Sequence, residues 1–131
     1  MADTPLEQFL AIGSGQSVTP VVRRLFADSE TPMGLYRKLA GGPGSFLLES
    51  ADQAGKWSRY SFVGVTAHGV LWEHDSEACW RDLGMSSDLA FGGDVPSDPL
   101  DALQLLHSRW ISEPMEGLPG FSGGLVGNIG W

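Results

Sequence analysis

A glutamate and a serine close a short apolar run, and together they carry groups that could bind a small zwitterion. In Leu48-Glu49-Ser50, the Glu49 carboxylate can accept hydrogen bonds from an ammonium group and the Ser50 hydroxyl can donate one to a carboxylate. Alternation along a strand places Leu48 and Ser50 on one face and Glu49 on the other, with backbone groups free where pairing ends. The run is therefore a candidate ligand site, although a Glu-Ser pair at a strand end is more often an ordinary surface feature.

The other groups that could do chemistry lack the spacing that such chemistry needs. Metal-ligand spacing is missing between the single cysteine, Cys79, and the three histidines, which are His68, His74 and His107. Gly123-Gly124 lies in an apolar segment without the Gly-Lys-Ser/Thr ending of a phosphate loop. We therefore predict no metal site, and we interpret the glycines as places of close backbone packing.

Composition narrows the partners that the chain can have. Its 131 residues carry sixteen acids and eight Lys or Arg, a formal net charge of −8. The longest basic run is the pair Arg23–Arg24, whereas nucleic acids and anionic membranes require a focused positive surface. Met1 is followed by neither a secretory signal nor an apolar run of about 20 residues, the length of a membrane helix. We expect a soluble, cytoplasmic protein with Cys79 as a reduced thiol.

Three segments carry the signals of a helix start, a capping residue followed by proline. Thr4-Pro5 predicts a short helix through Leu10, Thr31-Pro32 predicts a helix over about 31–40, and Asp98-Pro99 predicts one over about 98–111. The last has a single apolar stripe typical of a helix that lies on a sheet, made of Leu100, Leu103, Leu106 and Trp110. The tryptophans are interpreted as core aromatics: Trp57, Trp72, Trp80, Trp110 and Trp131.

Alternating and β-branched runs predict strands between these helices. Residues 45–50, 59–65 and 69–73 are expected to form an antiparallel meander, with Asp52–Gly55 as the first connection. Residues 78–80 can add a strand, although 75–97 has no clean periodicity, and 18–26 is expected to be an extended edge segment because it contains a proline.

The apolar, glycine-rich segment 121–131 is interpreted as a further strand. It stops on Trp131 without a turn or a cap, so we expect a chain cut within an element, with an exposed edge that favours self-association. These elements predict a single α+β domain over 1–131. Its fold is expected to be a largely antiparallel β-sheet with the helices at 31–40 and 98–111 against one side.

Five segments, taken in order along the chain, resemble the amino-terminal region of anthranilate synthase component I. Ser45–Ser50 is followed by Trp57–Gly64, with Thr19-Pro20-Val21 and Asp28–Ala40 upstream and Phe121–Gly127 downstream. The resemblance covers about residues 18–131. It departs from the family pattern at Asn128 and at Gly130-Trp131, where the family has aromatic residues and an aromatic-Asp pair.

The resemblance implies a function for the parent enzyme and a smaller role for this chain. The family makes anthranilate from chorismate for tryptophan biosynthesis, with Mg²⁺ and with ammonia from a glutamine amidotransferase subunit. Its catalytic residues lie in a part that this chain does not contain, so we expect no catalytic residue and no bound cofactor here. Leu48, Glu49 and Ser50 are implied to form part of the site for the feedback effector L-tryptophan.

Two alternatives stay open at the level of sequence. The aminodeoxychorismate synthase large subunit has similar motifs and the same architecture. A stand-alone amino-acid-binding or interaction module would use the same strand end without an attached enzyme. The expected fold is a partial two-layer domain of the anthranilate synthase type.

Overall fold

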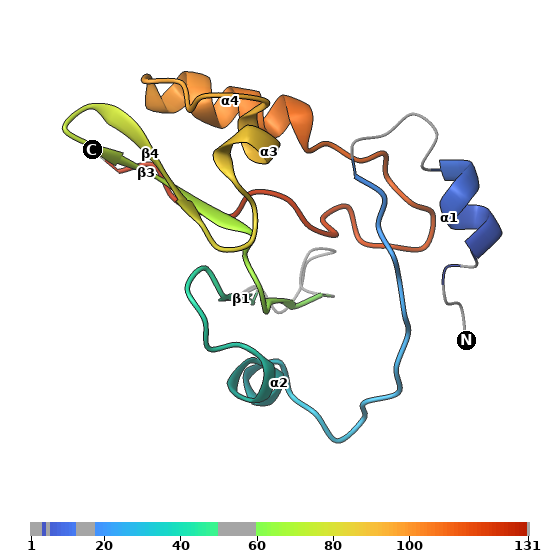
Figure 1. Cartoon of the computed structure of the whole chain (residues 1–131). Coiled ribbons are helices and arrows are strands. Elements are labelled where there is room, and N and C mark those ends of the chain that lie inside the picture. The colour runs from blue at the N-terminus through green and yellow to red at the C-terminus, as the bar shows by residue number, and fades with distance from the viewer. Residues whose placement is uncertain (1–3, 5, 13–17, 50–59, 131) are drawn as a thin grey trace.

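The computed structural model describes residues 4, 6–12, 18–49 and 60–130. In this part of the chain the elements are four helices and four strands, and the strands form two separate antiparallel pairs (Figure 1). The predicted α+β class with antiparallel pairing is therefore confirmed. A single sheet with both helices on one side is not what forms, because each strand pair has its own covering helix.

The first pair consists of β1 (Phe46–Leu48) and β2 (Phe62–Gly64), as the sequence predicted. Helix α2 (Pro32–Leu39) packs against both strands. It starts where Thr31 was expected to cap it, since the Thr31 hydroxyl accepts a hydrogen bond from the Gly34 amide at 3.0 Å. The expected turn at Asp52–Gly55 lies outside the described residues.

The second pair is a hairpin of β3 (Gly69–His74) and β4 (Glu77–Asp82). Asp75 and Ser76 connect the strands with positive φ angles of 52° and 65°, the backbone form of a two-residue type I′ turn. The strand suggested at 78–80 is thus confirmed and is longer than expected. The meander is wrong, because β3 pairs with β4 rather than with β2; closing a two-residue loop costs little entropy.

Helices α3 (Ser87–Phe91) and α4 (Pro99–Arg109) cover one face of this hairpin (Figure 1). The buried hydrophobic residues of the described chain lie here: Ala90, Phe91, Ala102 and Leu106. Leu71, Ala78 and Trp80 pack against them. The ring of Trp80 meets that of Phe91 edge-on at 5.3 Å. This helix-on-hairpin unit is the main hydrophobic core.

Two expectations fail in this unit. Helix α3 was not predicted, because one turn of helix is too short to show a periodic pattern. Helix α4 buries Ala102 and Leu106, with Leu105 and Trp110 beside them, whereas Leu100 of the predicted stripe is 62% exposed. Leu100 follows the cap and first proline, and the buried face begins two residues later.

The amino-terminal helix α1 (Leu6–Ile12) is where a short helix was predicted, but Thr4 has another role. Its hydroxyl accepts a hydrogen bond from the Val22 amide, and its own amide donates to the Val22 carbonyl, both at 3.0 Å. Thr4 therefore fastens the chain to the extended segment 18–26. Along the same segment, the Arg24 guanidinium donates to the carbonyl of Gly117 at 3.1 Å.

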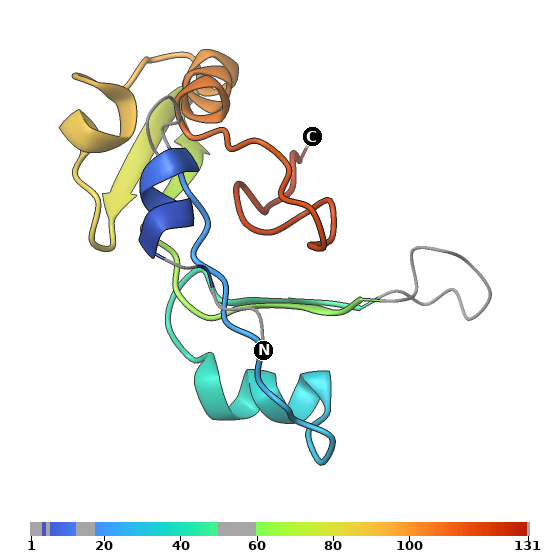
Figure 2. The same ribbon diagram turned by 90° about the vertical axis from the view of Figure 1, so that its right-hand side faces the viewer.

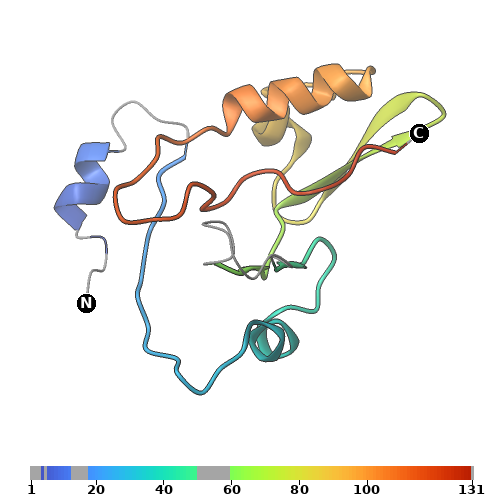
Figure 3. The same cartoon turned by 180° about the vertical axis from the view of Figure 1, so that it is seen from behind.

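Residues 121–130 form no strand in the described part of the chain, so that prediction is wrong. Gly123 and Gly124 have φ angles of 155° and 132°, outside the range of an ordinary strand residue. The segment instead crosses the space between the helix-on-hairpin unit and the β1–β2 pair, on the side opposite α2 (Figures 2 and 3). None of the described helices is both long enough and apolar enough to cross a membrane.

Candidate functional site

The strand end that was singled out from the sequence is a strand end in the structure. β1 ends at Leu48, Glu49 follows it at once, and the side chains of both residues are exposed. Leu48 is 44% exposed, which differs from the usual burial of leucine in a sheet. Ser50 lies outside the described residues, so the proposed set is placed at Leu48 and Glu49 only.

An aromatic group borders Leu48. Leu48 lies opposite Phe62 in the β1–β2 register, so the two side chains share one face of the pair. The Phe62 ring lies 6.5 Å from that of Tyr60 and 5.3 Å from that of Phe121, the latter edge-on at 82°. We call Tyr60, Phe62 and Phe121 the aromatic cluster.

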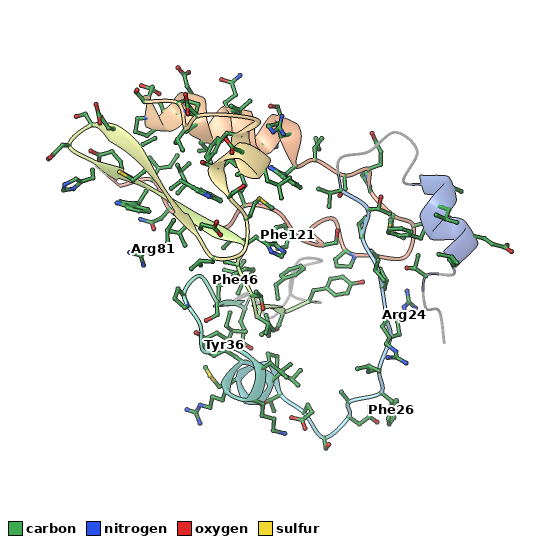
Figure 4. All side chains as sticks on the ribbon, in the orientation of Figure 1. Arg24, Phe26, Tyr36, Phe46, Arg81 and Phe121 are labelled. Atoms are coloured by element: carbon green, nitrogen blue, oxygen red, sulfur yellow. The ribbon has the colours of Figure 1, made fainter. Side chains whose placement is uncertain are left out.

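The two faces of the pair are covered by different parts of the chain. Helix α2, which carries Tyr36, lies on one side, and Phe121 approaches from the other (Figure 4). On the Phe121 side, the ring of Phe46 lies across Gly64, its partner in the register, where a Cβ atom would collide with the ring. This glycine is needed for close approach: it lets an aromatic ring cover the strand.

The sequence predicted only part of this arrangement. Tyr60 lies against Phe62, with the two ring centres 6.5 Å apart. The two-residue spacing of Tyr60 and Phe62 already placed both on one strand face, so that half of the cluster was accessible to sequence reasoning. Phe121 was not, because it belongs to a distant segment whose predicted strand does not form.

The charged side chains of the described residues lie at the protein surface. No charged side chain is buried among the described residues. Lys38 of α2 donates to both oxygens of Glu30, at 2.6 and 2.8 Å, in an ion pair that solvent reaches from the lysine side. Exposed pairs of this kind contribute little to stability. Glu49 is likewise an exposed carboxylate and does not belong to a buried charge network.

The remaining candidate residues do not gather into a second site. The described chain contains no group of three or more His, Cys, Asp or Glu side chains that could hold a metal ion. His74 lies 3.5 Å from Asp75 on the exposed hairpin turn.

The tryptophans divide into core and surface residues. Trp80 and Trp110 pack against the core, as predicted. Trp72 is 40% exposed with the Arg81 guanidinium 5.5 Å from its ring centre, so its assignment to the core is wrong. It lies on the hairpin face opposite Trp80, where alternation along β3 turns it away from the helices. Trp57 and Trp131 lie outside the described residues.

Fold and site together define a mixed α+β unit with a candidate small-molecule site at a strand end. Comparison with known proteins adds the family. The chain is 46% identical to "Anthranilate synthase component 1" of Mycolicibacterium smegmatis over 95% of its length, and 43% identical to that of Arthrobacter globiformis over 96%. The protein of the same name from Pseudomonas aeruginosa is 35% identical over 95% of the chain.

These similarities confirm the resemblance predicted from the motifs: the chain is a relative of anthranilate synthase component 1. It spans 23% to 25% of the length of the three relatives named above. No protein-family model matches the chain.

Proposed function

We propose that the chain is the amino-terminal part of an anthranilate synthase component 1 and forms one wall of a feedback site for L-tryptophan. The observation that supports this proposal is the arrangement of side chains at the end of β1. Leu48 is exposed and lies beside the aromatic cluster, and the exposed carboxylate of Glu49 follows it in the sequence. The similarity to proteins of that name over nearly the whole chain supports the family half of the proposal.

The groups at the strand end match the parts of a tryptophan molecule. The Glu49 carboxylate is an acceptor for the ammonium group of the amino acid, and charge-assisted hydrogen bonds of this type are among the stronger ones. Leu48 and the ring of Phe62 offer an apolar surface for the indole ring, and indole rings gain from edge-on or offset contact with other rings. Ser50 is assigned to the same site through the family resemblance alone.

The reaction itself is assigned to the rest of the parent enzyme. We propose that chorismate, the Mg²⁺ ion and the catalytic groups are held by polypeptide outside this chain, and that a glutamine amidotransferase subunit supplies ammonia in the cytoplasm. The role left to this chain is regulation.

Feedback inhibition then requires a free-energy coupling between two sites. If tryptophan binds more tightly to a state with weak affinity for chorismate, chorismate must weaken tryptophan binding by the same factor. The proposal thus predicts that tryptophan and chorismate each raise the dissociation constant of the other, although they bind at different sites. Titration of tryptophan at several chorismate concentrations measures this factor.

The proposal is tested by substituting Ser50 in the intact enzyme. In a Ser50→Phe variant a large ring replaces the hydroxyl that the family resemblance assigns to the effector site, so anthranilate formation should continue when tryptophan is added. Ser29→Phe, a substitution at an exposed position before α2, is the matched control and should stay sensitive. Unchanged inhibition of the Ser50→Phe enzyme, measured by anthranilate fluorescence, would show that the effector binds elsewhere.

A further inference from the structure

The contact between Phe62 and Phe121 joins two segments that are far apart in the sequence. Phe62 belongs to β2 and lies opposite Leu48, and Phe121 opens the glycine-rich segment that crosses above the strand pair (Figure 4). Their rings are 5.3 Å apart at 82°, which is the edge-to-face geometry favoured by the charge distribution of aromatic rings.

Side-chain packing holds the glycine-rich segment in place. No hydrogen bond involves residues 121–130 in the part of the chain that the structure describes. Gly123 and Gly124, two and three residues after Phe121, have φ angles outside the range of an ordinary strand residue. Leu125, Val126 and Ile129 are exposed, whereas Phe121 is half-buried. Phe121 is therefore the side chain of this segment that is fixed against β2.

We infer that Phe121 is a positioning residue for the tryptophan site, acting through Phe62. By meeting the Phe62 ring edge-on, it fixes the orientation of that ring and hence the width of the apolar surface beside Leu48. This inference rests on the proposed function, and it adds a determinant of specificity. An indole ring covers more of this surface than a phenyl ring does, so its binding should depend more strongly on the orientation of the Phe62 ring.

Two readouts separate positioning from a merely structural role. Loss of packing alone would weaken the binding of every amino acid equally. Loss of positioning should weaken L-tryptophan more than L-phenylalanine, so the ratio of their dissociation constants changes. A second readout is non-additivity: if Phe121 acts through Phe62, removing both rings should cost no more affinity than removing Phe62 alone.

The experiment is calorimetric titration of the intact enzyme with L-tryptophan and L-phenylalanine. Phe121→Leu should raise the dissociation constant for tryptophan about three- to tenfold, the range expected for an aromatic pair. Phe121→Tyr keeps the ring and should restore binding. Phe26→Leu removes a phenylalanine ring that is 90% exposed, on the segment before α2, and is the control expected to bind as the unsubstituted enzyme does.

Each outcome decides the inference. If Phe62→Leu weakens tryptophan binding and Phe121→Leu does not, the positioning role is overturned and the proposed function stands. If the unsubstituted enzyme does not bind tryptophan, both are overturned. Thermal unfolding checks that each variant folds; should Phe121→Leu not fold, Phe121→Met, which fills a similar volume, carries the same comparison.

Discussion

The indole Nε1 of Trp110 donates a hydrogen bond to the backbone carbonyl of Ala90 at 2.9 Å, which joins the end of α4 to the end of α3. The same carbonyl accepts a second bond from the Nε of Arg109 at 3.2 Å. The last carbonyls of a helix have no partner within the helix. Consecutive side chains of α4 and its cap therefore satisfy a carbonyl of a buried residue in α3.

Trp110→Phe removes one of these two donors and keeps an aromatic ring. The free energy of unfolding should fall by about 1 kcal/mol, the net worth of a typical intramolecular hydrogen bond. Chemical denaturation followed by circular dichroism measures it. Trp72→Phe, on the exposed face of the hairpin, keeps the ring beside Arg81 and serves as the control. An equal loss in the control would contradict the assignment to the Ala90 contact.

Leu106→Ala should be among the most destabilising substitutions in the chain. Its side chain is 2% exposed in the main core, and truncation of a buried leucine to alanine costs about 2–5 kcal/mol. Leu100→Ala, one turn or more away on the same helix and 62% exposed, should change the free energy of unfolding by less than about 0.5 kcal/mol. Similar losses in both variants would mean that α4 buries the stripe predicted from the sequence.

Gly69→Ala tests the packing of Trp80 against the hairpin. A Cβ atom on Gly69 would collide with the indole ring of Trp80, and overpacking of this kind costs roughly 1–3 kcal/mol. Gly41→Ala places its Cβ in open space and should be neutral or slightly stabilising. Thermal unfolding of the two variants measures the difference, and a stable Gly69→Ala variant would show that the ring lies elsewhere.

Asp98→Ala removes the cap of α4. Its Oδ1 accepts hydrogen bonds from the amides of Leu100 and Asp101, at 2.8 and 3.0 Å. Loss of such a cap costs about 0.5–2 kcal/mol. Asp98→Asn retains an acceptor in the same place and should lose much less. If the asparagine variant is destabilised as strongly as the alanine variant, charge near the helix start rather than capping stabilises α4.

The elements predicted well are those with signals in adjacent residues. Thr31-Pro32 and Asp98-Pro99 mark the starts of α2 and α4 because a cap, a proline and the first helical amides interact within one turn. The apolar runs around Phe46 and Phe62 are strands in the structure for a similar reason. The order of the motifs was enough to indicate the family, since the family pattern is itself a feature of the sequence.

Tertiary structure decided which faces and segments meet. The pairing of β3 with β4, the exposure of Leu100 and the short helix α3 all depend on contacts between distant residues, which periodicity along one segment does not encode. The candidate site divides in the same way. Sequence alone indicated Leu48, Glu49 and Ser50, whereas only the folded chain brings Phe121 to Phe62, because two rings attract each other through space whatever their separation along the chain.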